Sequence, residues 1–197
     1  MRIFNTSGPC NPEQHYTVMR EALMAQGQAL VDHGRFFTIF APRQSGKTTY
    51  FQLLFRQLPY LPVRVSFEGM RTLGRAKFYE TFARRLQRGL SEQGIGVEFT
   101  FADQVDLQNS LEVAKWPNQR LVLVIDEFEE VAPDVLGELL HVFRDIYQYK
   151  QHYALQSLLL VGVSTLAELV VSSASPFNVV DQLQIPYFTE AEVADLI

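Results

Sequence analysis

The sequence predicts an α/β fold in which a mainly parallel sheet of about five strands lies between two layers of helices. Apolar runs of strand length alternate along the chain with amphipathic segments of helix length, and this alternation is typical of parallel strands joined by helical crossovers. The run Leu121–Ile125 is continuously apolar, as expected for a central strand covered on both faces. A length of 197 residues with 47% hydrophobic content predicts one domain over 1–197.

The elements are expected in the following order. A helix over 14–32 ends at His33-Gly34, where glycine suits a helix stop. A strand over 35–40, a helix from 47 to about 57, a strand over 63–67 and helices over 75–93 and 102–114 follow. The second half contains strands over 121–125, 158–163 and 182–185, a helix over 133–150, and a last helix that opens with a capping box of Thr189 and Glu192.

Residues 41–48, Ala-Pro-Arg-Gln-Ser-Gly-Lys-Thr, match the phosphate-binding pattern GxxxxGK[ST] with Ala41 in the first glycine position. A loop that leads into a helix N-terminus offers several free N–H groups to phosphate oxygens. Gly46 permits close approach, Lys47 brings an ammonium group to the outer phosphates, and the Thr48 hydroxyl suits Mg²⁺. Thr49 also suits a packing position in the helix. The nucleotide-binding residues predicted here are Arg43, Gln44, Ser45, Gly46, Lys47, Thr48 and Thr49.

The apolar run at 121–125 ends in Asp126 and Glu127, which is a Walker B pattern. In a parallel sheet, such a strand end lies at the edge where ligands bind. We expect Asp126 to hold Mg²⁺ with Thr48, and Glu127 to act as the general base for an attacking water. Glu127 and Lys47 are therefore the candidate catalytic residues. Glu68 is the alternative base, because it follows the strand 63–67, although that strand is expected to lie further from the phosphate loop.

Other nucleotide-binding classes fit less well. A small GTPase needs an NKxD motif for guanine, which the chain lacks, and the DxxG match at 134–137 falls within a predicted helix. A small-molecule kinase needs no second carboxylate beside the Walker B aspartate, so the Asp126-Glu127 pair favours hydrolysis.

Composition limits the partners and the compartment. The net charge is -5, and no Lys or Arg follows Lys150, so general affinity for nucleic acid is not indicated. No apolar stretch is long enough for a membrane span and no signal peptide is recognisable, which predicts a cytoplasmic protein without membrane contact. The single cysteine, Cys10, cannot form an internal disulfide.

One predicted helix carries a local basic face opposite an apolar side. This face is either a solvated surface or a docking surface for nucleic acid or an acidic partner. Its basic residues are Arg71, Arg75, Lys77, Arg84, Arg85 and Arg88.

Two hydroxyls follow the predicted strand 158–163. Ser164 is a candidate for sensing the terminal phosphate. Thr165 could do the same, but Thr165 and Glu168 also have the spacing of a capping box, which would engage Thr165 at a helix start.

The chain resembles the AAA-like ATPase domains grouped near the STAND signalling ATPases. The resemblance lies in the phosphate loop 41–49, the Walker B segment 123–127, the segments Ser-Pro-Phe-Asn at 175–178 and Phe-Thr-Glu-Ala-Glu-Val at 188–193, and the pairs Gly8-Pro9 and His15-Tyr16. It implies a P-loop NTPase fold of the ASCE/AAA-like type that binds ATP or ADP with Mg²⁺. It also implies that the segment 1–34 contributes to the base pocket, with Pro9, His15 and Tyr16 near the base.

The resemblance raises two further expectations. Many ring-forming relatives carry an arginine after the sensing strand, whereas this region has none, and Arg144 lies earlier in the chain. A helical lid is expected beyond residue 197, followed there by an effector domain, or the chain acts on a separate protein partner.

The leading hypothesis is therefore Mg²⁺-dependent ATP binding and hydrolysis by a regulatory or signalling module. One alternative is a nucleotide-dependent interaction switch with little turnover. The other is a nucleic-acid-associated ATPase that acts through the basic helix.

Overall fold

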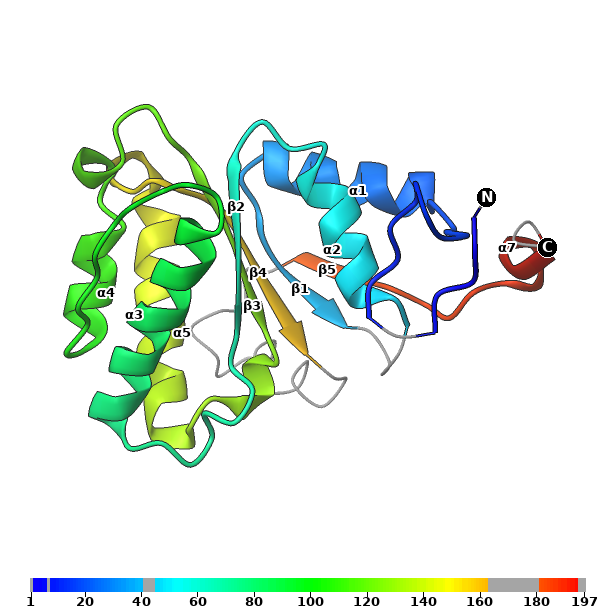
Figure 1. The fold of residues 1–197 in the computed structure, drawn as a ribbon. Coiled ribbons are helices and arrows are strands. Elements are labelled where there is room, and N and C mark those ends of the chain that lie inside the picture. The colour runs from blue at the N-terminus through cyan, green and yellow to red at the C-terminus, as the bar shows by residue number, and fades with distance from the viewer. Residues whose placement is uncertain (1, 7, 41–44, 163–180, 195–197) are drawn as a thin grey trace.

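A computed structural model describes residues 2–6, 8–40, 45–162 and 181–194 of the chain. Its centre is a five-stranded sheet in which every neighbouring pair is parallel, in the order β2-β3-β4-β1-β5. The predicted α/β class is confirmed (Figure 1). The strands are β1 (Phe36–Phe40), β2 (Leu61–Ser66), β3 (Leu121–Asp126), β4 (Leu155–Gly162) and β5 (Asp181–Gln184).

Helices form a layer on each side of the sheet (Figure 1). One layer contains α1 (Glu21–Asp32) and α2 (Lys47–Phe55), and the other contains α3 (Arg75–Ser91), α4 (Gln104–Ser110) and α5 (Pro133–Gln148). A short helix, α7 (Glu190–Ala194), lies near the N-terminal segment. Single 3-10 turns occur at Val113–Lys115, Phe128–Glu130 and Lys150–His152.

Strand β3 shows why the sequence folds into three layers. Leu121, Leu123 and Ile125 pack into the core beneath α3 and α5, whereas Val122 and Val124 pack into the core beneath α1 and α2. All five side chains are buried, because successive residues of a strand point to opposite faces. The uninterrupted apolar run is therefore the signature of a strand covered on both sides.

An aromatic cluster supports the end of the sheet where the acidic residues lie. Phe67, directly after β2, is fully buried. Its ring lies 5.2 Å from that of Phe78 and 5.0 Å from that of Phe82, both on α3, and 6.3 Å from that of Phe128 after β3. The cluster fixes the ends of two neighbouring strands against one helix.

Three elements differ most from their predicted bounds. Helix α1 begins at Glu21 rather than at 14, because Arg20 adopts a left-handed backbone (φ 48°, ψ 52°) and the residues before it form a turn and a bridge between Ile3 and His15. Helix α4 is shorter, from Asp103 as its N-cap to Ser110, whose carbonyl accepts a hydrogen bond from the Trp116 indole. Strand β4 begins at Leu155, three residues earlier than predicted.

The early start of β4 was hidden by polar residues. Ser157 is fully buried within the strand, and its hydroxyl donates a hydrogen bond to the backbone carbonyl of Arg35. Buried polar groups are accommodated when they are hydrogen-bonded, so a serine here does not interrupt the strand.

Within the described part of the chain, no helix combines the length and apolar character needed to cross a membrane.

Candidate functional site

Helix α2 begins at Lys47, and Gly46 precedes it with a left-handed backbone (φ 86°, ψ 16°). Among the described residues no side chain caps this helix N-terminus, and a Cβ placed on Gly46 would meet nothing within 4 Å. Glycine is therefore required by the backbone conformation rather than by crowding. Uncapped N–H groups beside open space fit the phosphates of a nucleotide.

Ser45 lies at the same place and is only 4% exposed. Its hydroxyl has no hydrogen-bond partner among the described residues. A buried polar atom normally has a partner, so this hydroxyl fits a site that a ligand completes. Lys47 and Thr48 line an adjoining cavity together with Pro9 and Gly8.

Thr49 has a different environment from the residues before it. Its hydroxyl accepts a hydrogen bond of 3.0 Å from the backbone N–H of Cys10. This contact attaches the N-terminal segment to α2. Thr49 therefore holds these two segments together, and it also lines both cavities beside the loop. Arg43 and Gln44 lie outside the described residues, and so do Ser164, Thr165 and the segment 175–178.

The acidic pair lies at the same edge of the sheet as the phosphate loop. Asp126 is the last residue of β3, and the loop follows the parallel strand β1, with β4 between the two strands. Neighbouring strands lie about 4.8 Å apart, so the axes of β1 and β3 are separated by about 10 Å. Asp126 and Thr48 supply the oxygen donors that Mg²⁺ prefers. The described residues contain no cluster of three or more His, Cys, Asp or Glu side chains placed to hold a metal ion.

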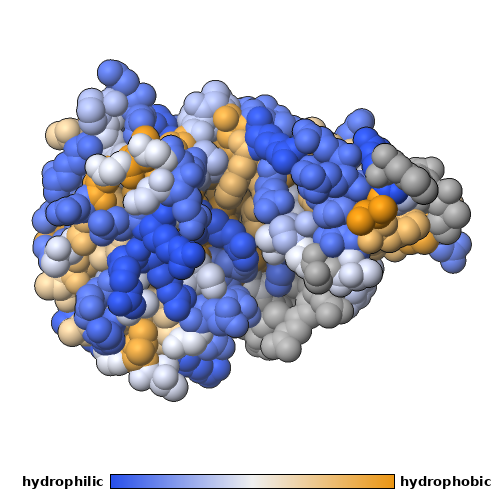
Figure 2. Space-filling view, in the orientation of Figure 1, coloured by the Kyte–Doolittle hydropathy of each residue, from blue (hydrophilic) through white to orange (hydrophobic). Residues whose placement is uncertain are grey.

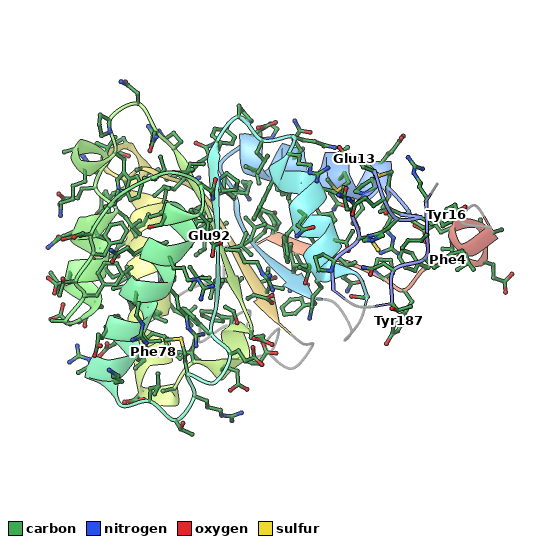
Figure 3. All side chains as sticks on the ribbon, in the orientation of Figure 1. Phe4, Glu13, Tyr16, Phe78, Glu92 and Tyr187 are labelled. Atoms are coloured by element: carbon green, nitrogen blue, oxygen red, sulfur yellow. The ribbon has the colours of Figure 1, made fainter. Side chains whose placement is uncertain are left out.

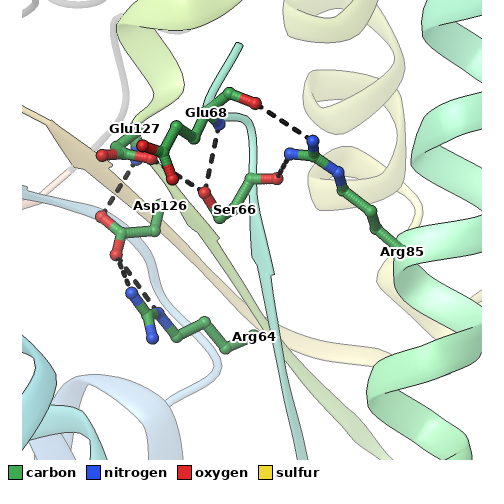
Figure 4. A network of polar contacts seen from close by, with 6 residues as sticks. All are labelled: Arg64, Ser66, Glu68, Arg85, Asp126 and Glu127. Atoms are coloured by element: carbon green, nitrogen blue, oxygen red, sulfur yellow. Dashed lines mark hydrogen bonds and ion pairs between the residues drawn. The ribbon is translucent and has the colours of Figure 1, made fainter. Parts of the chain in front are cut away.

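Arg64 contacts Asp126 directly (Figure 4). Its Nη2 and Nε atoms lie 2.5 and 3.2 Å from Oδ2 of Asp126, while Oδ1 of Asp126 accepts the backbone N–H of Glu127. Arg64 comes from the middle of β2, and its side chain is 37% exposed against 7% for Asp126. This contact was not predicted from the sequence. The signal for it was a charged residue, Arg64, between Val63 and Val65 in a predicted strand.

Glu127 is held by Ser66 rather than by a cation (Figure 4). The Ser66 hydroxyl donates a hydrogen bond of 2.8 Å to Oε2 of Glu127 and accepts the backbone N–H of Glu68. Arg85 of α3 donates to the backbone carbonyls of Ser66 and Glu68. Glu68 itself is exposed after β2, and β2 is an edge strand beyond β3, as expected for a residue further from the loop.

A second cavity, of about 300 Å³, adjoins the start of α2. Its walls come from the N-terminal segment, from α2 and from the chain after β5. Tyr16 lines this cavity, and its ring lies 4.8 Å from that of Phe4. His15 is not among its lining residues, and its Nδ1 accepts the backbone N–H of Asn11. Pro9 lines the neighbouring cavity.

Three of the six residues of the predicted basic face pair with acidic side chains. Arg75 contacts Glu138, Lys77 contacts Glu80, and Arg88 contacts Glu92. Figure 2 shows a hydrophilic surface over this helix, on which these pairs balance part of the basic charge. Arg144 is exposed on α5.

The parallel sheet, the glycine-capped start of α2 and the Asp126-Glu127 strand end define a P-loop NTPase fold. The family model described as "AAA domain" matches residues 30–170. The chain therefore belongs to the AAA domain family, whose members are nucleotide-binding ATPases. A comparison with curated proteins finds no significant match.

Solved structures with the same fold are distant in sequence. The Walker-type ATPase of Pyrococcus abyssi is 13% identical with a TM-score of 0.65, over 98% of this chain and 59% of that one. Cdc6p from Pyrobaculum aerophilum is 16% identical with a TM-score of 0.62, over 90% of this chain and 48% of that one. The ADP form of the Aeropyrum pernix ORC2 protein is 15% identical with a TM-score of 0.61, over 91% and 51%. The chain thus spans about half to three fifths of these proteins.

Proposed function

We propose that the chain binds ATP with Mg²⁺ and hydrolyses it as a regulatory or signalling module. Lys47 and the N–H groups at the start of α2 bind the phosphates, Thr48 and Asp126 hold the metal, and Glu127 orients or deprotonates the attacking water. Bound Mg²⁺ would neutralise charge on the outer phosphates. The observation that carries the proposal is the position of the uncapped α2 N-terminus and the Asp126-Glu127 pair at one edge of the sheet.

A Lys47→Met variant tests the phosphate end of this site. It should bind Mg-ATP about ten- to a hundred-fold more weakly, because one charge-assisted contact to phosphate is lost. Isothermal titration calorimetry measures the difference. Lys77→Met is the matched control, since Lys77 is exposed on α3 and pairs with Glu80. Equal affinities for the parent chain and Lys47→Met would contradict the proposed phosphate site.

Arg64 gives a second test, directed at the metal. Its guanidinium contacts Oδ2 of Asp126, and the proposal assigns the Asp126 carboxylate to Mg²⁺. The two cations should therefore compete, and Arg64→Gln should need about five-fold less Mg²⁺ for half-maximal ATP binding if the partly exposed pair contributes about 1 kcal/mol. Titrating Mg²⁺ at fixed ATP measures this. A higher Mg²⁺ requirement would show instead that Arg64 holds Asp126 in its binding orientation.

Two other functions give different results in simple assays. A nucleotide-dependent interaction switch with little turnover would bind ATP but release no phosphate in a single-turnover experiment. A nucleic-acid-associated ATPase would be stimulated by DNA or RNA at low salt and lose the stimulation as salt rises. The ion pairs along α3 favour neither stimulation nor general nucleic-acid binding.

A further inference from the structure

Arg20 is a cation near the proposed nucleotide site whose side chain makes several contacts with the chain after β5. Its guanidinium contacts both carboxylate oxygens of Glu192, at 3.0 and 3.3 Å, and donates to the backbone carbonyl of Pro186 at 2.8 Å. It also lies over the ring of Phe188, 4.5 Å from the centroid. The Arg20 side chain is only 9% exposed, and that of Glu192 is 27% exposed.

The backbone conformation of Arg20 is also unusual. A left-handed conformation is uncommon for a residue other than glycine, and Arg20 adopts it immediately before α1. The N-terminal segment therefore ends at Arg20, and α1 begins directly after it. The side chain of the same residue contacts the chain after β5. One residue therefore joins the segment before α1 to the segment before α7.

Glu192 is also held on its own side of the contact. It forms the predicted capping box with Thr189, in which each side chain accepts the backbone N–H of the other residue. The N–H of Thr189 and then the guanidinium of Arg20 lower the pKa of Glu192. The carboxylate that Arg20 contacts is thus charged at neutral pH and fixed at the start of α7.

The same group of residues forms one wall of the 300 Å³ cavity beside the phosphate loop. Arg20, Phe188 and Ile185 line it together with Ser45 and Gly46. Figure 3 shows Phe4, Tyr16 and Tyr187 at the end of the molecule that carries α7. The backbone N–H of Ile185 donates to the carbonyl of Phe40 at the end of β1, so this wall is attached to the sheet on one side and to Arg20 on the other.

We propose that Arg20 is a positioning residue for the nucleotide base: it holds the segment 185–192 as the wall of the base cavity and couples base binding to the position of α7. The inference rests on the proposed nucleotide site. A flat base suits a cavity with aromatic and apolar walls, and Arg20 contacts the wall rather than the phosphates. Loss of Arg20 should therefore affect the base and leave phosphate binding intact.

The experiment compares two ligands, Mg-ATP and Mg-tripolyphosphate, which lacks the base. Affinities are measured by calorimetry for the 197-residue chain and for Arg20→Met, Arg20→Lys and Lys47→Met. Arg20→Met should bind ATP about five- to a hundred-fold more weakly, the range expected when base stacking is lost, with unchanged tripolyphosphate affinity. Arg20→Lys should recover part of the loss, and Lys47→Met should weaken both ligands.

Arg35→Met is the matched control. Arg35 also joins the N-terminal half to the chain near β5, through Asp181 at 2.6 Å, but it does not line the cavity. It should leave both affinities unchanged.

The coupling to α7 is measured with Tyr187→Trp. Its indole fluorescence should respond to ATP but not to tripolyphosphate. In a chain that also carries Arg20→Met, the response to ATP should be lost.

The outcomes separate the two proposals. If Arg20→Met binds ATP as tightly as the parent, or weakens both ligands equally, the role of Arg20 is refuted while the phosphate site stands. If the parent binds neither ligand, the proposed function itself fails and this inference fails with it.

Discussion

A Glu127→Gln variant is expected to bind ATP like the parent chain and to hydrolyse it about 10²- to 10⁴-fold more slowly, the usual effect of losing a positioned general base. Glutamine has the same shape, and its carbonyl can still accept the hydrogen bond that the Ser66 hydroxyl donates to Glu127. The substitution therefore removes the basic group and little else. Single-turnover phosphate release and calorimetric ATP binding, measured on the same preparation, separate the two steps.

Glu68→Gln is the matched control for this experiment. Glu68 lies close in sequence to Ser66 and shares its hydrogen-bond network, but through its backbone N–H rather than its carboxylate. We expect this variant to hydrolyse ATP at close to the parent rate. Full activity in Glu127→Gln with loss in Glu68→Gln would make Glu68 the base. A parent chain that binds ATP and releases no phosphate would favour the interaction switch.

The sheet could be predicted because its signals are local and strong. The run Leu121–Ile125 has no polar interruption. Each of its residues is apolar because it is buried beneath one of the two helix layers. The start of α2 at Lys47 and the strand end at Asp126 follow from motifs whose spacing reflects phosphate and metal chemistry. The parallel order of the strands follows from the alternation with helices.

The contacts between distant segments could not be predicted in the same way. Arg64 reaches Asp126 because β2 is paired in register with β3, Ser66 lying opposite Asp126, and no local pattern encodes that pairing. The late start of α1 coincides with Arg20, whose left-handed backbone is accompanied by contacts with residues near the far end of the chain. The two residues predicted to lie near the base, His15 and Tyr16, are adjacent in sequence, yet of the two only Tyr16 lines the cavity.

Phe67→Ala is expected to destabilise the fold by about 3 to 5 kcal/mol, as large aromatic truncations in cores do. Phe67 is fully buried, and its ring meets Phe78, Phe82 and Phe128 from two other elements. These neighbours are fixed by α3 and by the turn after β3, so the cavity can collapse only in part. For a chain of this size the melting temperature should fall by roughly 6 to 20 °C, which differential scanning calorimetry measures.

The same substitution should also affect the site, because Phe67 follows Ser66 and Phe128 follows Glu127. Loss of the ring between them should loosen the hydrogen bond between Ser66 and Glu127, whereas the start of α2 lies two strands away. At a temperature where the variant is folded, phosphate release should therefore change more than tripolyphosphate affinity. Tyr187→Ala, at a position 66% exposed, removes an aromatic ring without opening a core cavity and should leave the melting temperature nearly unchanged. A loss of less than 1 kcal/mol in Phe67→Ala would show that the cluster repacks, and that the strand ends are held by their backbone pairing alone.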